Sequence, residues 1–443
     1  MSDRSLDRRR FLHGLGVAAA LGSAGCSGLS LGSEDEPRLA AQDLQGLTSD
    51  PAPTIPQRLP VDIEGAYLEA IATSVRETLE TVPAPLTATH VPNGAIREDL
   101  AHLREHAETD LEAARDAPSP SEALDDYRRA GSTATELATA WAVIDDGLTR
   151  ADVAERASAI DQTRSRFEQR WSYVGTDPVT ASVLHAALER RVRTATRILA
   201  MDDADRPKPP ENSLTIGEFA GDLYQARAAI EDADYLYRQH THALTDGDDL
   251  QDRLESAAEG LGGAITARKA QLPDVDASDP STFVDRDISA TPAAEVLQDL
   301  YRELDRSDYA AEERAAGRPA NAVLAAVWTL AKFRAFDAIL EDVTEGESYA
   351  IETVDDVRTI RTAAVDALTA TTEAIDAPIL ANQTLDRLSG DLRFADRRLT
   401  DRDGAVRVSF IRYEIAQYVE IAAIARALPA SVAKAVDALR TGS

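Results

Sequence analysis

The sequence predicts an all-α fold in which two antiparallel helical bundles follow a disordered tether. Apolar residues recur at helical spacing almost everywhere after Val61, and proline or glycine residues separate the periodic stretches. No alternating run of four or more β-branched residues appears, so a sheet is not expected. The 443 residues, 44% of them apolar, are enough to bury two cores.

Residues 26–60 are the expected tether. They are rich in glycine, serine, proline and acidic residues, and they show little periodicity. Such a composition is typical of a semi-extended linker. Helices are then expected at 61–82, 93–116, 121–149, 151–173, 178–201, 214–244, 249–271, 292–316, 319–343, 353–376, 378–399, 404–428 and 430–440.

Two bundles divided by a linker are the expected organisation of these helices. The first bundle is expected over 61–271, the linker over 272–291 and the second bundle over 292–443. Leucines and alanines of helix 378–399 follow a three-four spacing, which places them on one stripe for bundle packing. Helix 404–428 is apolar over most of its circumference, so we expect it to be central and mostly buried.

Three polar residues lie on one face of this expected central helix, namely Glu414, Gln417 and Glu420. If that face points inward, each of them needs a partner, because a buried charge without one is costly. Arginine side chains are the partners that we expect.

A weak internal repeat relates the two halves of the chain. The tetrapeptide at 178–181, PVTA, is similar to PILA at 378–381, and further leucine, arginine and alanine matches follow at the same shift. Matches of this kind in two helices also arise by chance. A tandem duplication and a chance likeness therefore both stay open.

The amino-terminal residues 1–25 predict a signal peptide. The apolar run that leads to Cys26 is too short to span the roughly 30 Å hydrocarbon core of a membrane, and basic, apolar and small residues follow each other as in export signals. The stretch RRRFL resembles the core of twin-arginine export signals, and this resemblance assigns the signal to Arg8, Arg9, Phe11 and Leu12.

Cys26, the only cysteine, closes a stretch that is similar to a lipobox, SAGC, with Ser23 where the usual motif has leucine. The resemblance implies that Cys26 is lipidated and becomes the first mature residue. A lipid with two chains would hold the body firmly, whereas one acyl chain binds only marginally. We therefore expect a lipid-anchored protein at the extracytoplasmic face of the cell membrane.

The net charge of −30, from 77 acidic and 47 basic residues, indicates the environment in which the protein works more than the kind of ligand it binds. Dispersed acid with little lysine resembles the composition of proteins from extreme halophiles, in which surface charge maintains solubility in concentrated salt. The charge also argues against nucleic acid as a partner, because phosphates require basic patches.

Catalytic motifs are absent from the sequence. There is no HExxH, no Walker A motif and no G-x-S-x-G, and a single cysteine excludes thiolate zinc and iron–sulfur sites. An enzyme is therefore less expected than a binding or scaffold protein. The arginines at 190, 191, 193 and 197 have acidic neighbours and predict a solvated ion-pair face rather than an anion site.

One candidate metal site consists of His102, Glu105 and His106, which share a helical face because residues three and four apart are neighbours. Two imidazoles and a carboxylate would suit a divalent transition metal. The alternative is a set of exposed or hydrogen-bonded histidines, and the same alternatives apply to His240 and His242.

An exported protein of two helical bundles with an H-x-x-E sequence resembles the imelysin-like family. That family carries G-x-H-x-x-E and is linked to metal capture or peptidase-like activity. His102 and Glu105 match the motif, and Leu100 stands where the family has glycine.

Asn382 begins a glycosylation sequon, N-Q-T, inside an expected helix. Asn382 is therefore a candidate glycosylation site. The function that the sequence favours is a membrane-anchored extracytoplasmic binding or scaffold lipoprotein without a cofactor, whose partner is an unknown protein or small ligand. The alternative is an imelysin-like protein that captures a metal or a small ligand.

Overall fold

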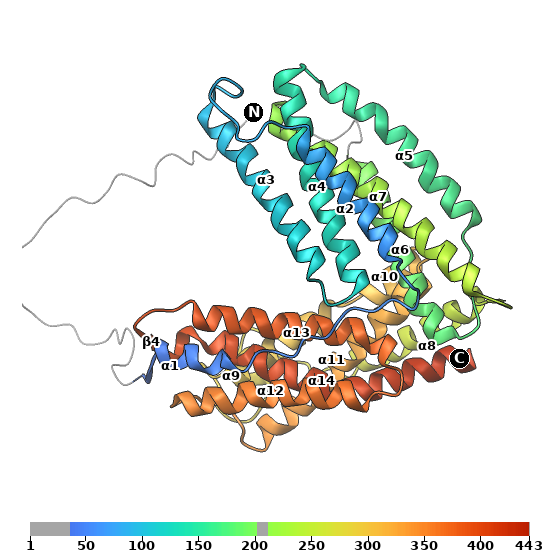
Figure 1. Ribbon diagram of the computed structural model, residues 1–443. Coiled ribbons are helices and arrows are strands. Elements are labelled where there is room, and N and C mark those ends of the chain that lie inside the picture. The colour runs from blue at the N-terminus through green and yellow to red at the C-terminus, as the bar shows by residue number, and fades with distance from the viewer. Residues whose placement is uncertain (1–35, 202–210, 443) are drawn as a thin grey trace, which may run out of the picture. The chain divides into compact units, whose positions relative to one another are not determined.

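Helices make up nearly all of the regular structure in the computed structural model, which describes residues 36–201 and 211–442 (Figure 1). The strands within these ranges are very short. They form two antiparallel pairs, β1 (Arg38–Ala40) with β4 (Ala405–Arg407) and β2 (Val174–Gly175) with β3 (Asp248–Asp249). The predicted all-α class is confirmed. None of the described helices contains a stretch long and apolar enough to cross a membrane.

The first bundle is built around one of two hydrophobic cores. Its helices are α2 (Gly65–Glu80), α3 (Gly94–Arg115), α4 (Pro120–Asp145), α5 (Arg150–Arg170), α6 (Pro178–Met201) and α7 (Ser213–Ala243). Side chains of Asn93, Ser119, Thr149 and Asn212 accept hydrogen bonds from the first backbone N–H groups of α3, α4, α5 and α7. These caps satisfy donors that have no partner inside the helix, and they explain where the helices begin.

Helices α4 and α7 pack closely because α7 presents glycine to its neighbour. A Cβ atom on Gly217 would lie 2.6 Å from the backbone oxygen of Glu136, and one on Gly221 would lie 3.1 Å from the backbone oxygen of Ser132. Any larger residue would push the helices apart. The small side chains therefore set the distance between the two helices.

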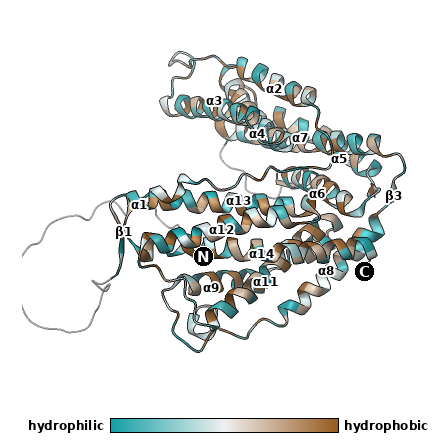
Figure 2. Ribbon diagram, turned by 60° about the horizontal axis from the view of Figure 1, so that its bottom comes forward, coloured by the Kyte–Doolittle hydropathy of each residue, from teal (hydrophilic) through white to brown (hydrophobic). Residues whose placement is uncertain are grey.

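The second bundle surrounds the other core. Its helices are α8 (Gln251–Lys269), α9 (Pro292–Arg306), α10 (Tyr309–Ala315), α11 (Pro319–Thr344), α12 (Val354–Ala374), α13 (Pro378–Thr400) and α14 (Arg412–Thr441), with the short helices η2 (Pro280–Thr282) and η3 (Val408–Phe410) between them. The hydrophobic colour is strong along α11 and α14 in Figure 2. The single helix predicted over 292–316 is two helices, because the chain turns extended at Ser307.

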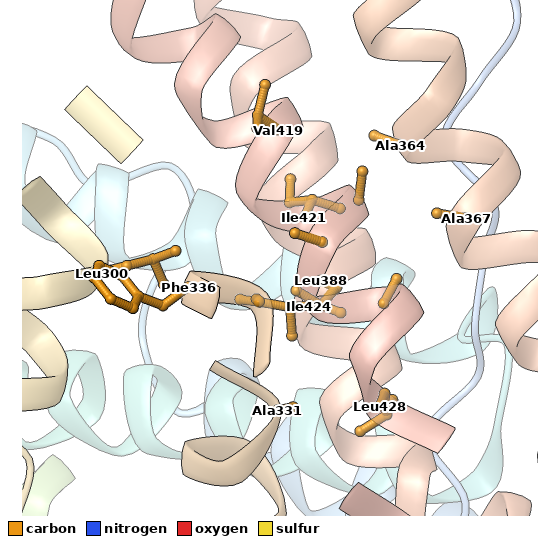
Figure 3. Packing of buried hydrophobic residues seen from close by; sticks show 14 of the residues in the cluster. Leu300, Ala331, Phe336, Ala364, Ala367, Leu388, Val419, Ile421, Ile424 and Leu428 are labelled. Carbon is orange, nitrogen blue, oxygen red and sulfur yellow. The ribbon is translucent and has the colours of Figure 1, made fainter. Parts of the chain in front are cut away.

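Helix α14 is the centre of the second bundle and contacts α8, α9, α11, α12 and α13. Figure 3 shows Ile421 and Ile424 among buried side chains of other helices, such as Phe336 and Leu388. Tyr418 is fully buried on the same helix. The prediction of a central buried helix is confirmed for the part of 404–428 that is helical.

Pro429 lies inside α14, although the sequence predicted that it separates two helices. Proline has no N–H group, so the carbonyl of Ala425 loses its usual partner within the helix. The hydroxyl of Thr371, on α12, donates to that carbonyl at 2.9 Å. This bond from a neighbouring helix satisfies the acceptor, and the helix continues past the proline.

Residues 37–60, which we call the N-terminal segment, are folded, so the predicted tether over 26–60 is wrong for these residues. The segment contains β1, the helix α1 (Ala41–Gly46) and the short helix η1 (Leu47–Ser49). Six of its apolar side chains are buried in the core of the second bundle, namely Leu39, Ala41, Leu44, Leu47, Ala52 and Ile55. Its composition resembles a linker, but these contacts fix it on the bundle.

The border between the two cores also differs from the prediction. Helix α8, expected in the first bundle, packs against α11 and α14, and its Leu254 and Leu261 lie in the second core. The expected linker at 272–291 lies inside the second bundle, with Ile288 fully buried. The division therefore falls before α8, which follows the β2–β3 pair directly.

Helix α6 belongs to both cores. Val183 and Ala186 on one face pack in the second core, whereas Leu184 and Leu188 pack in the first. The helix thus contributes apolar side chains to both bundles. It begins with Pro178, the residue that the weak repeat pairs with Pro378 at the start of α13.

A candidate ligand pocket in the second bundle

The residues that predict export and lipidation lie outside the described residues. They are Arg8, Arg9, Phe11, Leu12 and Cys26. The signal peptide and lipid anchor therefore stay predictions from the sequence.

The candidate metal site on α3 is not supported by the structure. His102, Glu105 and His106 are all exposed. Among the described residues, no group of three histidine, cysteine or acidic side chains is placed to hold a metal ion. The spacing puts the three residues on one face, as predicted, and that face points to solvent. The metal site there stays a prediction from the sequence.

The candidate glycosylation site is engaged in packing. The side chain of Asn382 accepts a hydrogen bond from the backbone N–H of Arg58 at 2.8 Å and donates to the carbonyl of Pro56 at 2.8 Å. Thr384, the third residue of the sequon, is buried on α13. The amide nitrogen that a glycan would modify donates to the N-terminal segment in the folded chain, and glycosylation stays a prediction from the sequence.

The second pair of histidines has a structural role in part. The Nε2 atoms of His240 and His185 both donate to the carbonyl of Val174, at 2.8 and 3.0 Å. Trp171 donates to Nδ1 of His185 at 3.1 Å. Burial lowers the pKa of His185 to about 4, so this imidazole is neutral at ordinary pH. His242 is exposed.

Two of the three polar residues on this face of α14 have charged partners. Glu414 is fully buried, and its Oε1 accepts from Arg398 at 3.0 Å and from Arg402 at 2.9 Å. Glu420 pairs with Lys332 at 3.3 Å, so a lysine stands where we expected an arginine. These ion pairs fix α14 against α11 and α13. Oε2 of Glu414 and Oε1 of Gln417 are buried without a hydrogen-bond partner among the described residues.

A large pocket, of about 880 Å³, lies between α11, α12, α14 and the loop that follows α11. Its volume falls in the range of small-molecule sites. Alanine side chains form much of its wall: Ala338, Ala350, Ala363, Ala422, Ala423, Ala427 and Ala430. Because alanine fills little space between helices, the three helices leave a hollow where they meet.

Two arginines line this pocket, Arg334 on α11 and Arg426 on α14, beside the carboxylates of Asp342, Glu347 and Asp356. Neither forms an ion pair with a carboxylate in the described part of the chain. Nη1 of Arg334 donates to the hydroxyl of Ser431 at 3.2 Å. Both guanidinium groups therefore keep donors for an anion, and a guanidinium suits the planar carboxylate or sulfonate group.

Tyr349 closes one side of the pocket and has a left-handed backbone, with φ of 53°. Such a conformation is costly for a bulky residue and persists only where the surroundings hold it. The hydroxyl donates to Asp342 at 3.2 Å, and burial beside that carboxylate raises the pKa of Tyr349. The uncharged ring of Tyr349 therefore forms part of the pocket wall, and the bond of its hydroxyl holds it in place.

The lining residues combine apolar and charged groups. Among the described residues, no histidine, cysteine, lysine or serine lines the pocket. The lining offers an apolar wall, two guanidinium groups and the carboxylates of Asp342, Glu347 and Asp356. Asp356 accepts bonds from Thr353 in the cap of α12, so its charge is already satisfied.

The comparisons with known proteins divide the chain at the same place as the two cores. Residues 66–247 match a family model described as Domain of unknown function (DUF8262). Residues 251–437 match a second model, Domain of unknown function (DUF8264). No curated protein and no solved structure matches the chain. Every residue that lines the pocket lies within the DUF8264 match.

Sequence reasoning missed this pocket, and the reason is physical. Alanines in a helix are ordinary helix formers, and nothing in the sequence tells which of them meet across a gap. The available signal was Arg334 and Arg426 in otherwise apolar stretches. Their lack of carboxylate partners depends on where the acidic side chains lie in the fold.

Proposed function

We propose that this protein is a lipid-anchored, extracytoplasmic binding protein of a salt-loving cell, and that the pocket of its second bundle takes a small amphiphilic anion. Export through the twin-arginine signal and anchoring at Cys26 rest on the sequence of residues 8–26. The ligand class rests on one observation, which is an alanine-walled pocket that holds two arginines without ion pairs.

The two parts of such a ligand would be recognised differently. The anionic group would take charge-assisted hydrogen bonds from Arg334 and Arg426, and the apolar body would cover the alanines of α12 and α14. At about 1 M salt the screening length is only about 3 Å, which weakens attraction at a distance but leaves direct contacts. An apolar body therefore preserves affinity in the salt that the acidic composition suggests.

Replacing Arg334 and Arg426 together by alanine should weaken binding of the dye anilinonaphthalene sulfonate about ten-fold or more. Each charge-assisted hydrogen bond contributes roughly 1.5–3 kcal/mol, and 1.4 kcal/mol is about ten-fold in affinity. Fluorescence titration of the purified protein, at low and at molar salt, measures the change. The uncharged dye phenylnaphthylamine should bind both proteins alike.

The matched control replaces Arg253 and Arg314 by alanine, because both are exposed arginines outside the pocket. This control should bind the sulfonate dye as the original chain does. Equal loss in the two double variants would mean that net charge, and not the pocket, attracts the dye. Loss of the uncharged dye as well would mean that the pocket had collapsed.

Changing Cys26 to Ser should release the protein from the membrane fraction or leave an uncleaved precursor, because the thiol is the proposed point of lipid attachment. Changing Arg8 and Arg9 to Lys should retain the protein inside the cell. Fractionation of cells, followed by mass measurement of the chain, checks both results. If both variants stay in the membrane fraction with unchanged mass, the proposed localisation is wrong.

A further inference from the structure

A second cavity, of about 350 Å³, lies in the first bundle between α4, α6 and α7, far in sequence from the alanine-walled pocket. Its charged lining residues are Arg128, Arg129, Arg190, Arg191, Asp125 and Asp232. Four guanidinium groups thus meet two carboxylates. The net charge of the chain is −30, so this local excess of positive charge differs in sign from the protein as a whole.

Three of these arginines already have acidic partners. Arg128 pairs with Asp232 at 2.6 Å, and Arg129 pairs with Asp126 at 2.8 Å. Arg191 lies 3.5 Å from Asp125. The carboxylates of these pairs balance the charges of the three arginines, so these arginines do not require a ligand.

Arg190 differs from the other three. It forms no ion pair with a carboxylate of the described residues, and its Nη1 donates to the amide oxygens of Asn321 at 3.4 Å and Gln383 at 3.3 Å. Both contacts are long for hydrogen bonds of a charged donor. Burial and the neighbouring Arg191 lower the pKa of Arg190 to about 10, which leaves the guanidinium charged at neutral pH. The side chain is only partly exposed, and a charge in such surroundings without a carboxylate in contact is costly.

We propose that this cavity, which we name the arginine cavity, binds a compact oxyanion such as phosphate, with Arg190 as its main ligand. Nε and Nη2 of Arg190 are the donors left for it, and the planar fork of a guanidinium matches two oxygens of a tetrahedral oxyanion. The cavity volume suits an anion of this size or the phosphate end of a larger molecule. This site is independent of the proposed pocket in the second bundle.

Asp125 faces the same cavity and opposes the anion. Its side chain is largely exposed and lies 3.5 Å from Arg191. Asp232 is satisfied by Arg128 and by the hydroxyl of Tyr67, which donates at 2.7 Å. Replacing Asp125 by Asn therefore removes the remaining repulsion, and the variant D125N should bind the oxyanion more tightly than the original chain.

The test compares the full chain with the variants R190Q and D125N by thermal unfolding and by calorimetric titration with inorganic phosphate. We expect phosphate to raise the unfolding temperature of the original chain. In R190Q the affinity should fall about ten-fold or more, since a charge-assisted contact is lost. Without phosphate, R190Q should be at least as stable as the original chain, because a partly exposed charge without a carboxylate in contact is gone.

Controls separate a site from a general effect of salt. R227Q removes an exposed arginine of α7 outside the cavity and should keep the response to phosphate. Acetate at the same ionic strength should give a smaller rise. An equal rise with acetate, or an unchanged response in R190Q, would overturn the proposal. Titration with glycerol phosphate then shows whether a phosphate carried on a larger molecule binds as well as the free ion.

Discussion

Removal of the N-terminal segment should prevent the second bundle from folding stably. A chain that begins at Val61 lacks Leu39, Leu44, Leu47 and Ile55, all of which are buried in the second core. Burying one such side chain contributes roughly 1.5–3 kcal/mol, and whole domains are stable by only about 5–15 kcal/mol. Circular dichroism during heating should show an early loss of helix, while the helices of the first bundle remain.

The control for this deletion is a chain that begins at Pro37 and keeps the whole segment. Leu44, which is fully buried, offers a milder version of the same test. Its replacement by alanine should cost about 2–5 kcal/mol of unfolding free energy. If the chain that begins at Val61 unfolds within a few degrees of the control, the segment does not support the core.

Replacing Asp396 by alanine should cost about 3–5 kcal/mol, because it leaves the charge of Arg361 buried without a partner. Asp396 accepts from Nε and Nη2 of Arg361, each at 2.8 Å, and from the hydroxyl of Tyr418 at 2.7 Å. Arg361 and Tyr418 are both almost inaccessible to solvent. Denaturant unfolding of the variant measures the loss.

An exposed ion pair on the same helix as Arg361 provides the comparison. Asp355 pairs with Arg358 on α12, and the side chains of both are largely exposed. Replacing Asp355 by alanine should cost less than about 1 kcal/mol, as is usual for surface pairs. Losses of similar size in the two variants would contradict the assigned role of the buried pair.

Helix boundaries were predictable where a local signal defines them. The helix expected at 178–201 is observed at Pro178–Met201, because proline is favoured in the first turn of a helix. Pro429 shows where a local signal is insufficient. Its effect depends on Thr371, a residue of another helix that the sequence could not place beside it.

The N-terminal segment was misread because its burial has no periodicity. Leu39, Leu44 and Ile55 are spaced by neither helix nor strand, and prolines stand among them. What buries them is a groove made by residues more than three hundred positions away. The metal prediction has a related limit, since spacing tells which residues share a face but not whether that face meets another helix.

The candidate sites show the same limit. Arg190 was predicted to belong to a solvated ion-pair face, and Arg191 does pair with Asp125. Only the placed partners reveal that Arg190 has no carboxylate of its own. The sequence shows which residues are charged, but the role of a charged residue depends on its neighbours in the fold.

The pairing of β1 with β4 has a consequence for the order in which the chain can fold. Arg38 lies opposite Arg407, so the first strand meets its partner only after almost the entire chain has been synthesised. The core of the first bundle, between Ile63 and Leu236, is complete far earlier. Contacts between residues so distant in sequence form slowly. The beginning of the chain is therefore among the last parts to reach its place, and until then Leu39, Leu44 and Leu47 are exposed to whatever else could cover them.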